Sequence, residues 1–449
     1  MLPRQGVTPE LARFIVDTKW DDLPETTRHE AKRALLNFFA VAIAGCRTQP
    51  VELALRTLGE FSGGRQATIV GRPERIDPLT AAFLNAAGAN VFDYCDTHLP
   101  TVVHPTSPLA PALLALSEIR QVTGPDLLLA FALGFEIECR VGGAISPGHY
   151  PKGWHITSTC GVFGSAAGAA KLLGLDVERT VWALGSAATQ SAGLCECLGW
   201  PAKSVSVGNA ARNGLFSALL AEKGFAGPPE PIAGAQGFLA AMGEPPDWAA
   251  LLDGLGQSWQ VTNNSIKPYA AGFVIHPLLD LALEWKRAHP DAAIDRIAVR
   301  GNPLLLQRTD RADIATGREA QVSLQHCVAA ALVLGKAGLD QLTDACVADP
   351  AIKALRGKFE CSADDRISTI AAEMDIWTVD GKKHALSTQA AAGSSSNPLK
   401  DAEIEAKLRD EARRWEPGQE IQPLIDAVWA LDRSEDVSAL LRLAVPTRR

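Results

Sequence analysis

Segments rich in alanine and leucine with helical spacing fill the chain from residue 9 to about residue 260, and they restrict its fold more than any other feature. Clear caps and stops separate these segments. Asp77 followed by Pro78 is an N-cap with proline at the first helical position, and it predicts a helix over "PLTAAFLNAAGANVF". This half of the chain is therefore predicted to be all α.

Two later helical segments indicate how the bundle packs. The first, "STCGVFGSAAGAAKLLGLD", repeats Gly, Ala and Ser on neighbouring turns, which allows another helix to approach closely. The second, "NAARNGLFSALLAEKGF", follows the segment that carries Lys203 and ends at Gly224, a residue type that often stops helices. We expect such helices to form a rigid scaffold.

The pattern changes after residue 290. The stretch "AIDRIAVRG" alternates apolar and polar residues, and "ISTIAAEMDIWTVDGKKHALST" predicts two strands around a turn at Asp380 and Gly381. A Gly/Ser/Pro linker, "AAAGSSSNP" (390–398), precedes "LKDAEIEAKLRDEARRW", where strong helical periodicity returns. We therefore predict a smaller α+β domain, after which the last fifty residues rejoin the helical domain.

Composition argues against several classes of function. The net charge is −8 and no run is rich in Lys or Arg, so a nucleic-acid partner is not predicted. Apolar stretches such as "LLNFFAVAIAG" end well short of the ~20 residues that a membrane span needs. The nine cysteines are scattered and the amino end lacks a signal pattern, which predicts a reducing, cytoplasmic location. An anionic substrate would need a local cluster of cations in a cleft.

Motifs for metal, nucleotide or serine-hydrolase chemistry are missing from the sequence. "CEC" at 195–197 has the wrong spacing for zinc, and neither an H-E-x-x-H nor a G-x-S-x-G motif occurs. The glycines of "GVFGSAAG" do not follow a predicted strand, so they make a poor dinucleotide fingerprint. We therefore expect chemistry without a metal.

Titratable residues concentrate in "VFDYCDTHLPTVVHP" (91–105), which contains Asp93, Asp96, Thr97 and two histidines. If the preceding helix continues for one more turn, Asp93 and Thr97 share a face. His104 then follows after a loop. The alternative is that the aspartates cap the helix and the histidines are solvated.

Four more residues are candidates on their context. His155 directly precedes the small-residue helix, where an imidazole faces unpaired backbone N–H groups that favour a nearby carboxylate; alternatively it bonds a backbone carbonyl. Lys203 and Lys267 are surface charges by residue type, although their apolar neighbours allow burial. His326, in "AQVSLQHCVAAALVLG", lies in a predicted buried helix, where a histidine is usually a satisfied core residue.

Taken together, these segments resemble the MmgE/PrpD family, which includes 2-methylcitrate dehydratase, cis-aconitate decarboxylase and iminodisuccinate epimerase. The resemblance is carried by "DLPETTRHEAKRALLNFFAVAIAG", "ATIVGRPERIDPLTAAFLNAAGANVFDYCDTH", "GWHITSTCGVFGSAAGAAKLLGLD", "KSVSVGNAARNG" and "IKPYAAGFVIHPLLD". It implies a mainly α protein, with a large all-α helical domain built from both chain ends (1–263 and 397–449) and a smaller inserted α+β lid domain (264–396). The active site would lie in the cleft between them. The resemblance also implies a homodimer that needs no metal or organic cofactor.

The resemblance assigns active-site positions to residues of this chain. The family positions correspond to Asp93, Thr97, His104, His155, Lys203 and Lys267, and we add Asp96, Tyr269 and His326 as substrate-binding candidates. The two lysines and protonated His104 would stabilise negative charge that develops beside a carboxylate. His155 is the favoured general base. Asp93 and Asp96 would accept hydrogen bonds that orient a histidine or a lysine, and Thr97 would contact a substrate carboxylate.

Three positions differ from the family pattern. Cys95 replaces an acid, the spacing from Thr97 to His104 is about one residue longer than in the decarboxylase, and His326 stands where a tyrosine is common. The last two change the pocket. The leading expectation is a metal-independent, 2-methylcitrate dehydratase-like lyase that acts on a small di- or tricarboxylate by proton abstraction. The alternatives are an iminodisuccinate epimerase-like isomerase, a cis-aconitate decarboxylase-like lyase, and a non-catalytic homologue that binds carboxylates.

Overall fold

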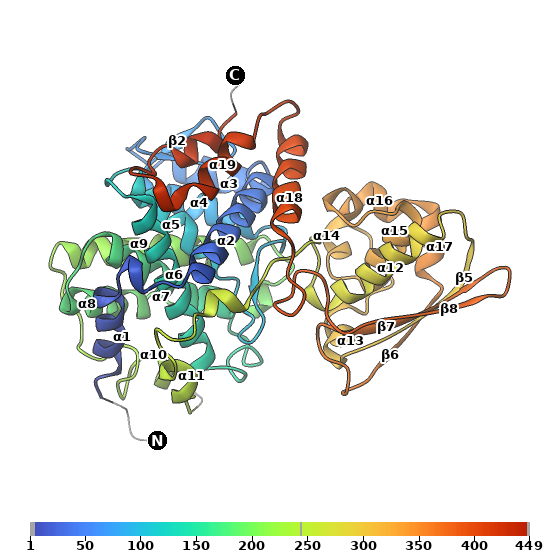
Figure 1. Ribbon diagram of the computed structural model, residues 1–449, viewed down its shortest axis with the longest axis horizontal. Coiled ribbons are helices and arrows are strands. Elements are labelled where there is room, and N and C mark those ends of the chain that lie inside the picture. The colour runs from blue at the N-terminus through green and yellow to red at the C-terminus, as the bar shows by residue number, and fades with distance from the viewer. Residues whose placement is uncertain (1–4, 243–244, 447–449) are drawn as a thin grey trace. The chain divides into compact units, whose positions relative to one another are not determined.

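The computed structural model describes residues 5–242 and 245–446, and its elements are mostly helices (Figure 1). The mainly α prediction is therefore confirmed. The chain forms two compact units. Unit 1 comprises the chain up to Val91, Cys95–Ser265 and the chain from Lys400 onward; unit 2 comprises Phe92–Tyr94 and Ile266–Leu399. The residues on both sides of Phe92–Tyr94 belong to unit 1. No local sequence signal therefore predicts that these three residues belong to unit 2.

Unit 1 is a helical bundle. Its helices are α1 (Val7–Asp17), α2 (Glu25–Gly45), α3 (Gln49–Gly59), α4 (Pro78–Asn90), α5 (Thr106–Ser117), α6 (Gly124–Ala144), α7 (Ile156–Leu172), α8 (Val177–Ala188), α9 (Ala202–Glu222), α10 (Phe238–Ala241), α11 (Trp248–Leu252), α18 (Asp401–Trp415) and α19 (Gln422–Trp429). Two-residue strands pair as β1 (Ala67–Thr68) with β2 (Arg75–Ile76), and as β3 (Thr97–His98) with β4 (Asn264–Ser265). Helix α18 packs beside α2 (Figure 1), so the C-terminal segment does return to the helical part.

The helix boundaries of unit 1 follow local sequence signals in most places. The Asp77 carboxylate caps α4 by accepting a hydrogen bond from the Thr80 backbone N–H at 3.0 Å, as the sequence predicts. Gly224, with φ of +86°, follows the end of α9. The start of α9 differs from the expectation that Lys203 precedes the helix, because α9 begins at Ala202 and includes Lys203 in its first turn.

Helices α6 and α7 pack closely through glycines, as the small-residue pattern predicts. A Cβ atom on Gly164 of α7 would lie 2.9 Å from the Gly134 carbonyl oxygen of α6, and one on Gly168 would lie 2.9 Å from the Ala130 carbonyl oxygen. Real Cβ atoms almost never approach another atom so closely. The backbones of the two helices therefore meet at a distance that only glycine allows.

A glutamate is enclosed in this helix contact. Glu138 of α6 is completely buried, and neither carboxyl oxygen has a hydrogen-bond partner among the described residues. Gly164 leaves room for it, since a Cβ atom there would lie 2.7 Å from the Glu138 Oε2 atom. Burial, reinforced by the charge of Asp96, raises the pKa of Glu138 well above its ordinary value. Burial therefore keeps this carboxyl neutral to a higher pH than an exposed glutamate.

We predict that replacing Glu138 with glutamine changes how stability depends on pH. The folded chain keeps a proton on Glu138 that the unfolded chain releases above its ordinary pKa of 4.5. Wild-type stability therefore falls with rising pH from that point up to the folded-state pKa, by about 1.4 kcal/mol per pH unit. Glu138→Gln lacks this loss, so its stability relative to wild type should increase as the pH rises above 4.5 and level off at the folded-state pKa, which urea unfolding at pH 5, 6, 7 and 8 measures. Parallel profiles for the two proteins would show that Glu138 is ionised in the folded state.

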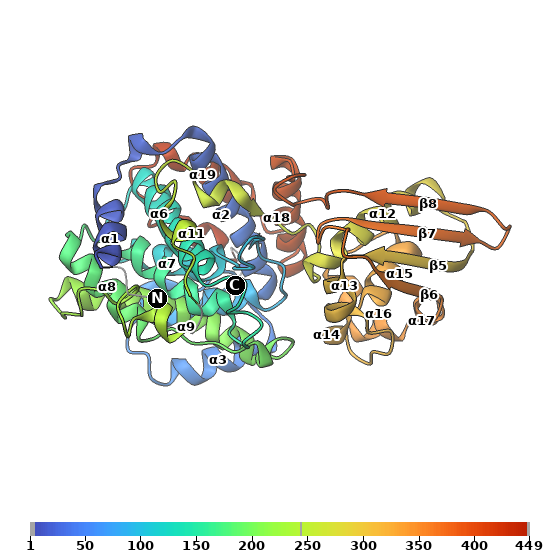
Figure 2. The same cartoon turned by 90° about the horizontal axis from the view of Figure 1, so that it is seen from below.

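Unit 2 contains a four-stranded sheet in the order β6-β5-β7-β8 (Figure 2). Its strands are β5 (Ile294–Gly301), β6 (Phe359–Ala363), β7 (Ala372–Thr378) and β8 (Lys383–Thr388); β6 is parallel to β5, and the other pairs are antiparallel. Its helices are α12 (His276–Ala288), α13 (Pro303–Thr309), α14 (Gly317–Ala320), α15 (Leu324–Leu334), α16 (Asp344–Ala348) and α17 (Pro350–Arg356). Helices α12 and α15 cover one face of the sheet (Figure 1). The predicted hairpin around Gly381, whose φ is +81°, is confirmed.

The helices of the described residues were compared with the length and apolarity that a membrane span needs. No single helix among them is long and apolar enough to cross a membrane. Helices α2 and α3 pass that test only as a pair, which is bent by 85°. Most residues of α2 are buried in the core of unit 1.

Candidate active site

The segment that follows α4 does not continue as a helix. Helix α4 ends at Asn90, Asp93 has a φ of +52°, and Thr97 lies in strand β3. Asp93 and Thr97 therefore do not share a helical face, and that expectation was wrong. The reason is tertiary, since β3 pairs with β4, whose residues lie far along the chain, and this pairing replaces the helical hydrogen bonds.

His104 is held by neighbouring groups of unit 1, which include Cys95 Sγ at 3.5 Å from its Nδ1 atom. Its Nδ1 atom lies 2.8 Å from the Asp96 carbonyl oxygen and 3.1 Å from Thr97 Oγ1, and its backbone N–H donates to Thr157 Oγ1 at 3.1 Å. A carbonyl oxygen can only accept, so Nδ1 carries a proton. In the neutral ring the basic nitrogen is then Nε2. His104 is buried, with 8% of its surface exposed, so the alternative of solvated histidines is wrong here.

The other histidine of the cluster, His98, is a structural residue. It is buried, and its Nδ1 and Nε2 atoms lie 2.8 Å from Thr101 Oγ1 and 3.1 Å from Gln260 Oε1. Burial lowers the pKa of His98 to about 4, which keeps the ring neutral at pH 7. Two side chains thus use both ring nitrogens of His98 to fix the loop before His104.

We expected the carboxylate of Asp96 to orient a histidine or a lysine, and the structure shows that it does not. Its Oδ2 atom accepts hydrogen bonds from Thr106 Oγ1 and, at 2.7 Å, from Asn264 Nδ2. The side chain is completely buried, and burial raises its pKa. The group of Asp96 that contacts His104 is the main-chain carbonyl. The carboxyl instead ties together the start of α5 and strand β4.

His155 occupies the N-cap position of α7, as predicted. Its Nδ1 atom lies 2.7 Å from Ser158 Oγ. This nitrogen therefore bonds a side-chain hydroxyl and not a backbone carbonyl, which was the alternative. Ser158 Oγ lies 2.6 Å from Ser206 Oγ, which donates to the Lys203 carbonyl at 2.9 Å. Lys203 itself is 6% exposed, so its apolar neighbours do bury it.

These contacts bring together three of the predicted catalytic residues of unit 1. His104 and His155 are joined through Thr157, which lies two residues after His155 in the first turn of α7. The imidazole of His155 is joined to the main-chain carbonyl of Lys203 through two serine hydroxyls. The first turns of α7 and α9 and the residues before α5 therefore form one hydrogen-bonded group.

Lys267 and Asp93 form a pair within unit 2. The Lys267 ammonium group donates to Asp93 Oδ2 at 3.0 Å and to the Asp93 carbonyl oxygen at 2.8 Å. The lysine side chain is 1% exposed, whereas that of Asp93 is 29% exposed. The expected contact between an acid and a lysine is thus present for Asp93. Tyr94 adds a hydrogen bond from its hydroxyl to the Pro268 carbonyl at 3.1 Å, which also fixes the 92–94 segment in unit 2.

The two other substrate-binding candidates of unit 2 make hydrogen bonds inside that unit. Tyr269 donates from its hydroxyl to Asp280 Oδ1 at 2.7 Å, and burial raises its pKa. His326 lies in α15 with Nε2 at 2.8 Å from the Gln341 carbonyl oxygen, and burial lowers its pKa. These contacts hold local structure. Their roles in substrate binding stay predictions.

The sequence prediction named Thr97 but not the hydroxyls of Thr157, Ser158 and Ser206. Thr157 and Ser158 follow His155 in "GWHITST", where the third residue of a helix faces its N-cap. That spacing could have suggested Ser158 as a partner of His155. Ser206 had no local signal, because it lies 48 residues from Ser158 along the chain.

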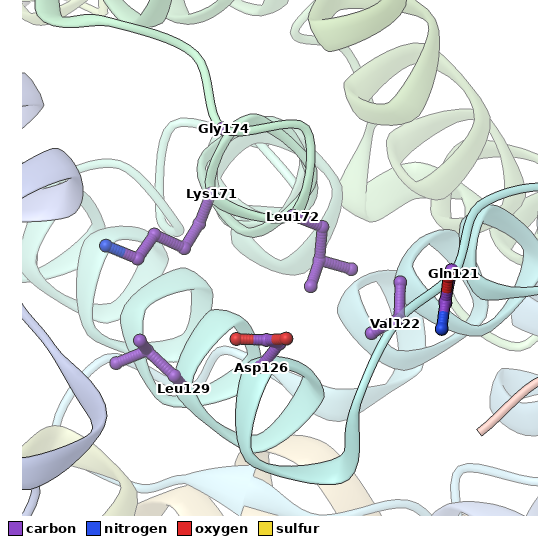
Figure 3. A pocket seen from close by; sticks show the side chains of 7 residues that line it. All are labelled: Gln121, Val122, Asp126, Leu129, Lys171, Leu172 and Gly174. Carbon is purple, nitrogen blue, oxygen red and sulfur yellow. The ribbon is translucent and has the colours of Figure 1, made fainter. Parts of the chain in front are cut away.

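A separate pocket of unit 1 lies outside this group. It has a volume of about 170 Å³ and is lined by Gln121, Val122, Asp126, Leu129, Lys171, Leu172 and Gly174 (Figure 3). Its lysine already donates to the carbonyls of Val16 and Thr18. None of the predicted site residues lines this pocket. Within the described ranges, no group of three or more His, Cys, Asp and Glu side chains is arranged to hold a metal ion.

Comparisons with known proteins identify the family of the chain. The MmgE/PrpD N-terminal domain matches residues 9–251, and the MmgE/PrpD C-terminal domain matches residues 269–431. A cis-aconitate decarboxylase-like protein of Aspergillus oryzae is 29% identical, with 98% of each chain covered. The cis-aconitate decarboxylases of Mus musculus and Homo sapiens are 28% and 27% identical, over 98% of this chain and 93% and 94% of theirs. The chain therefore belongs to the MmgE/PrpD family.

Proposed function

We propose that the protein is a lyase of the cis-aconitate decarboxylase type, acting on a small polycarboxylate. The observation that carries the proposal is the similarity along 98% of the chain to relatives that bear this name. It favours this alternative over the 2-methylcitrate dehydratase reaction that we expected first. His104, His155 and Lys203, whose segments share hydrogen bonds in unit 1, are the residue types that the chemistry needs.

The reaction breaks the bond between a carbon atom and one carboxylate. Carbon dioxide leaves, and the electron pair of that bond moves toward a remaining carboxylate, which must be stabilised by positive charge. Lys203 and protonated His104 are the candidate cations of unit 1. A proton must then reach the carbon, and the product carries it in a new C–H bond.

His155 is the candidate for that proton transfer. An imidazolium gives up a proton readily near neutral pH, and the neutral imidazole then recovers one from solvent. The same group would remove a proton in an elimination or an epimerisation, so its assignment does not depend on which reaction occurs. The roles of Lys267 and Asp93 toward this substrate, the lid role of unit 2 and the homodimer stay predictions.

Proton NMR in heavy water, combined with measurement of released carbon dioxide, tests the proposal. The substrates are cis-aconitate, citrate, 2-methylcitrate and iminodisuccinate, each at the same concentration with the full chain. We expect carbon dioxide only from cis-aconitate, with one solvent deuterium in each product molecule. Water loss from 2-methylcitrate would instead identify a dehydratase, and deuterium exchange in iminodisuccinate would identify an epimerase. Binding of these acids without any reaction would identify a non-catalytic homologue.

A further inference from the structure

Two serine hydroxyls lie in series between the imidazole of His155 and the backbone of α9. Ser158 is the third residue of α7 and is buried, and Ser206 is the fifth residue of α9 and is partly buried. The successive distances are 2.7 Å from His155 Nδ1 to Ser158 Oγ, 2.6 Å to Ser206 Oγ and 2.9 Å to the Lys203 carbonyl oxygen. We call His155, Ser158, Ser206 and this carbonyl the serine relay.

The last member of the relay fixes the direction of every hydrogen bond in it. A carbonyl oxygen can only accept, so the single hydroxyl hydrogen of Ser206 points to Lys203. Ser206 Oγ must then accept from Ser158, which uses the only hydrogen of that hydroxyl. Ser158 Oγ must in turn accept from His155. The proton of the neutral imidazole therefore resides on Nδ1, and Nε2 has the basic lone pair.

Gly193 packs against the serine relay, and a larger residue at this position would displace the two serine side chains. Gly193 has a φ of +144°, and a Cβ atom there would lie 2.7 Å from Ser158 Cβ and 3.3 Å from Ser206 Cβ. The Gly193 carbonyl also accepts from the His155 backbone N–H at 3.0 Å. The same loop residue thus fixes the backbone of His155 and packs against the side chains of both serines. This close packing restricts the relay to one geometry.

We propose that Ser158 and Ser206 are positioning residues that hold His155 in the Nδ1-protonated tautomer, so that Nε2 is the atom that exchanges protons with the substrate. The inference rests on the proposed function for its catalytic meaning. In the imidazolium state Nδ1–H stays bonded to Ser158, so Nε2–H is the proton to be transferred. Free histidine favours the opposite tautomer, with the proton on Nε2. Without the relay, a neutral His155 would therefore lose much of its basic Nε2 form.

Nitrogen NMR tests this inference without any substrate. The full chain is labelled with 15N-histidine, and the His155 signals are identified by their loss in His155→Asn. At a pH where the ring is neutral, we expect a protonated-type Nδ1 and an unprotonated-type Nε2 in wild type. Ser158→Ala should move both signals toward the Nε2-protonated tautomer. Ser206→Ala should move them in the same direction, because Ser158 can then turn its hydrogen toward His155.

The matched control is Ser206→Thr, which keeps a hydroxyl that can bond the carbonyl three residues earlier in the helix. It should keep the wild-type tautomer, and kcat on cis-aconitate should stay near wild type. Ser158→Ala should lower kcat by about 10- to 100-fold, with a smaller change in KM. Circular dichroism and the urea midpoint verify folding, and Ser206→Ala provides the test if Ser158→Ala does not fold.

Identical His155 nitrogen signals in wild type and in both alanine variants would overturn the inference. An Nε2-protonated ring in wild type would overturn it as well. If the tautomer changes as expected but no substrate reacts, the relay stands and the proposed function fails. The two proposals therefore fail separately.

Discussion

Replacing His155 with alanine is expected to lower the rate of solvent-deuterium incorporation and of carbon dioxide release by about 10²- to 10⁴-fold, the usual contribution of a general acid or base. The physical reason is that the serine relay aims the imidazole of His155 from the N-cap of α7, and alanine has no group that can transfer a proton. Proton NMR of cis-aconitate turnover in heavy water measures both quantities. Calorimetric binding of the substrate should change much less than the rate.

A surface histidine provides the control for this experiment. The side chain of His29 is 44% exposed and contacts Asp401 at 3.1 Å, so His29→Ala should keep the wild-type rate. If His155→Ala incorporates deuterium as fast as wild type, His155 is not the proton-transfer residue. His104→Ala then becomes the next variant to measure, because the Nε2 atom of His104 is also in the basic form when the ring is neutral.

Replacing Arg140 with methionine should destabilise unit 1 by about 3–5 kcal/mol, the usual cost of breaking a buried ion pair by removing one partner. Both side chains of the Arg140–Glu136 pair are 1% exposed, and Arg140 Nε donates to Glu136 Oε1 at 2.5 Å. The guanidinium also donates to the carbonyls of Leu251, Asp253 and Ser258. Methionine leaves these carbonyls and the Glu136 carboxylate without their partner.

Urea unfolding followed by tryptophan fluorescence measures this loss. The second variant, Glu136→Gln with Arg140→Met, removes the buried charge but keeps an acceptor for the Gln260 backbone N–H, which bonds Glu136 Oε2 at 2.6 Å. It should be more stable than the single variant, since burial already raises the pKa of Glu136 against the opposing charge of Arg140. A single variant that loses less than about 1 kcal/mol would mean that the pair behaves as an exposed one.

Much of the fold follows from signals within a few residues of one another. The cap at Asp77 begins α4, the alternation of "AIDRIAVRG" becomes β5, and the turn at Gly381 joins β7 to β8. Helices α6 and α7 also meet through glycines, as their composition indicates. Caps, hydrophobic period and turn residues act over one or two turns of chain, so they can be read from the sequence without knowledge of the tertiary contacts.

Less of the candidate site than of the fold could be predicted from the sequence. The residue types and their positions came from the resemblance to the family, whereas their partners did not. The expected extra turn after α4 was wrong because β4 pairs with β3, and Asp96 bonds Asn264, 168 residues away, rather than a histidine or lysine. Asp93 lies with Lys267, 174 residues further along the chain, in a different unit from Thr97.

The sequence by itself determined the main helices of unit 1, the strands β5, β7 and β8, and the family that the chain resembles. Only the tertiary structure decided that Lys203 and Lys267 are buried and that His98 is structural. It also decided that Ser206 completes the relay to His155. The physical reason is range: helix caps and periodicity arise between neighbours, whereas burial and the direction of a hydrogen bond depend on whichever distant groups the packing brings within reach.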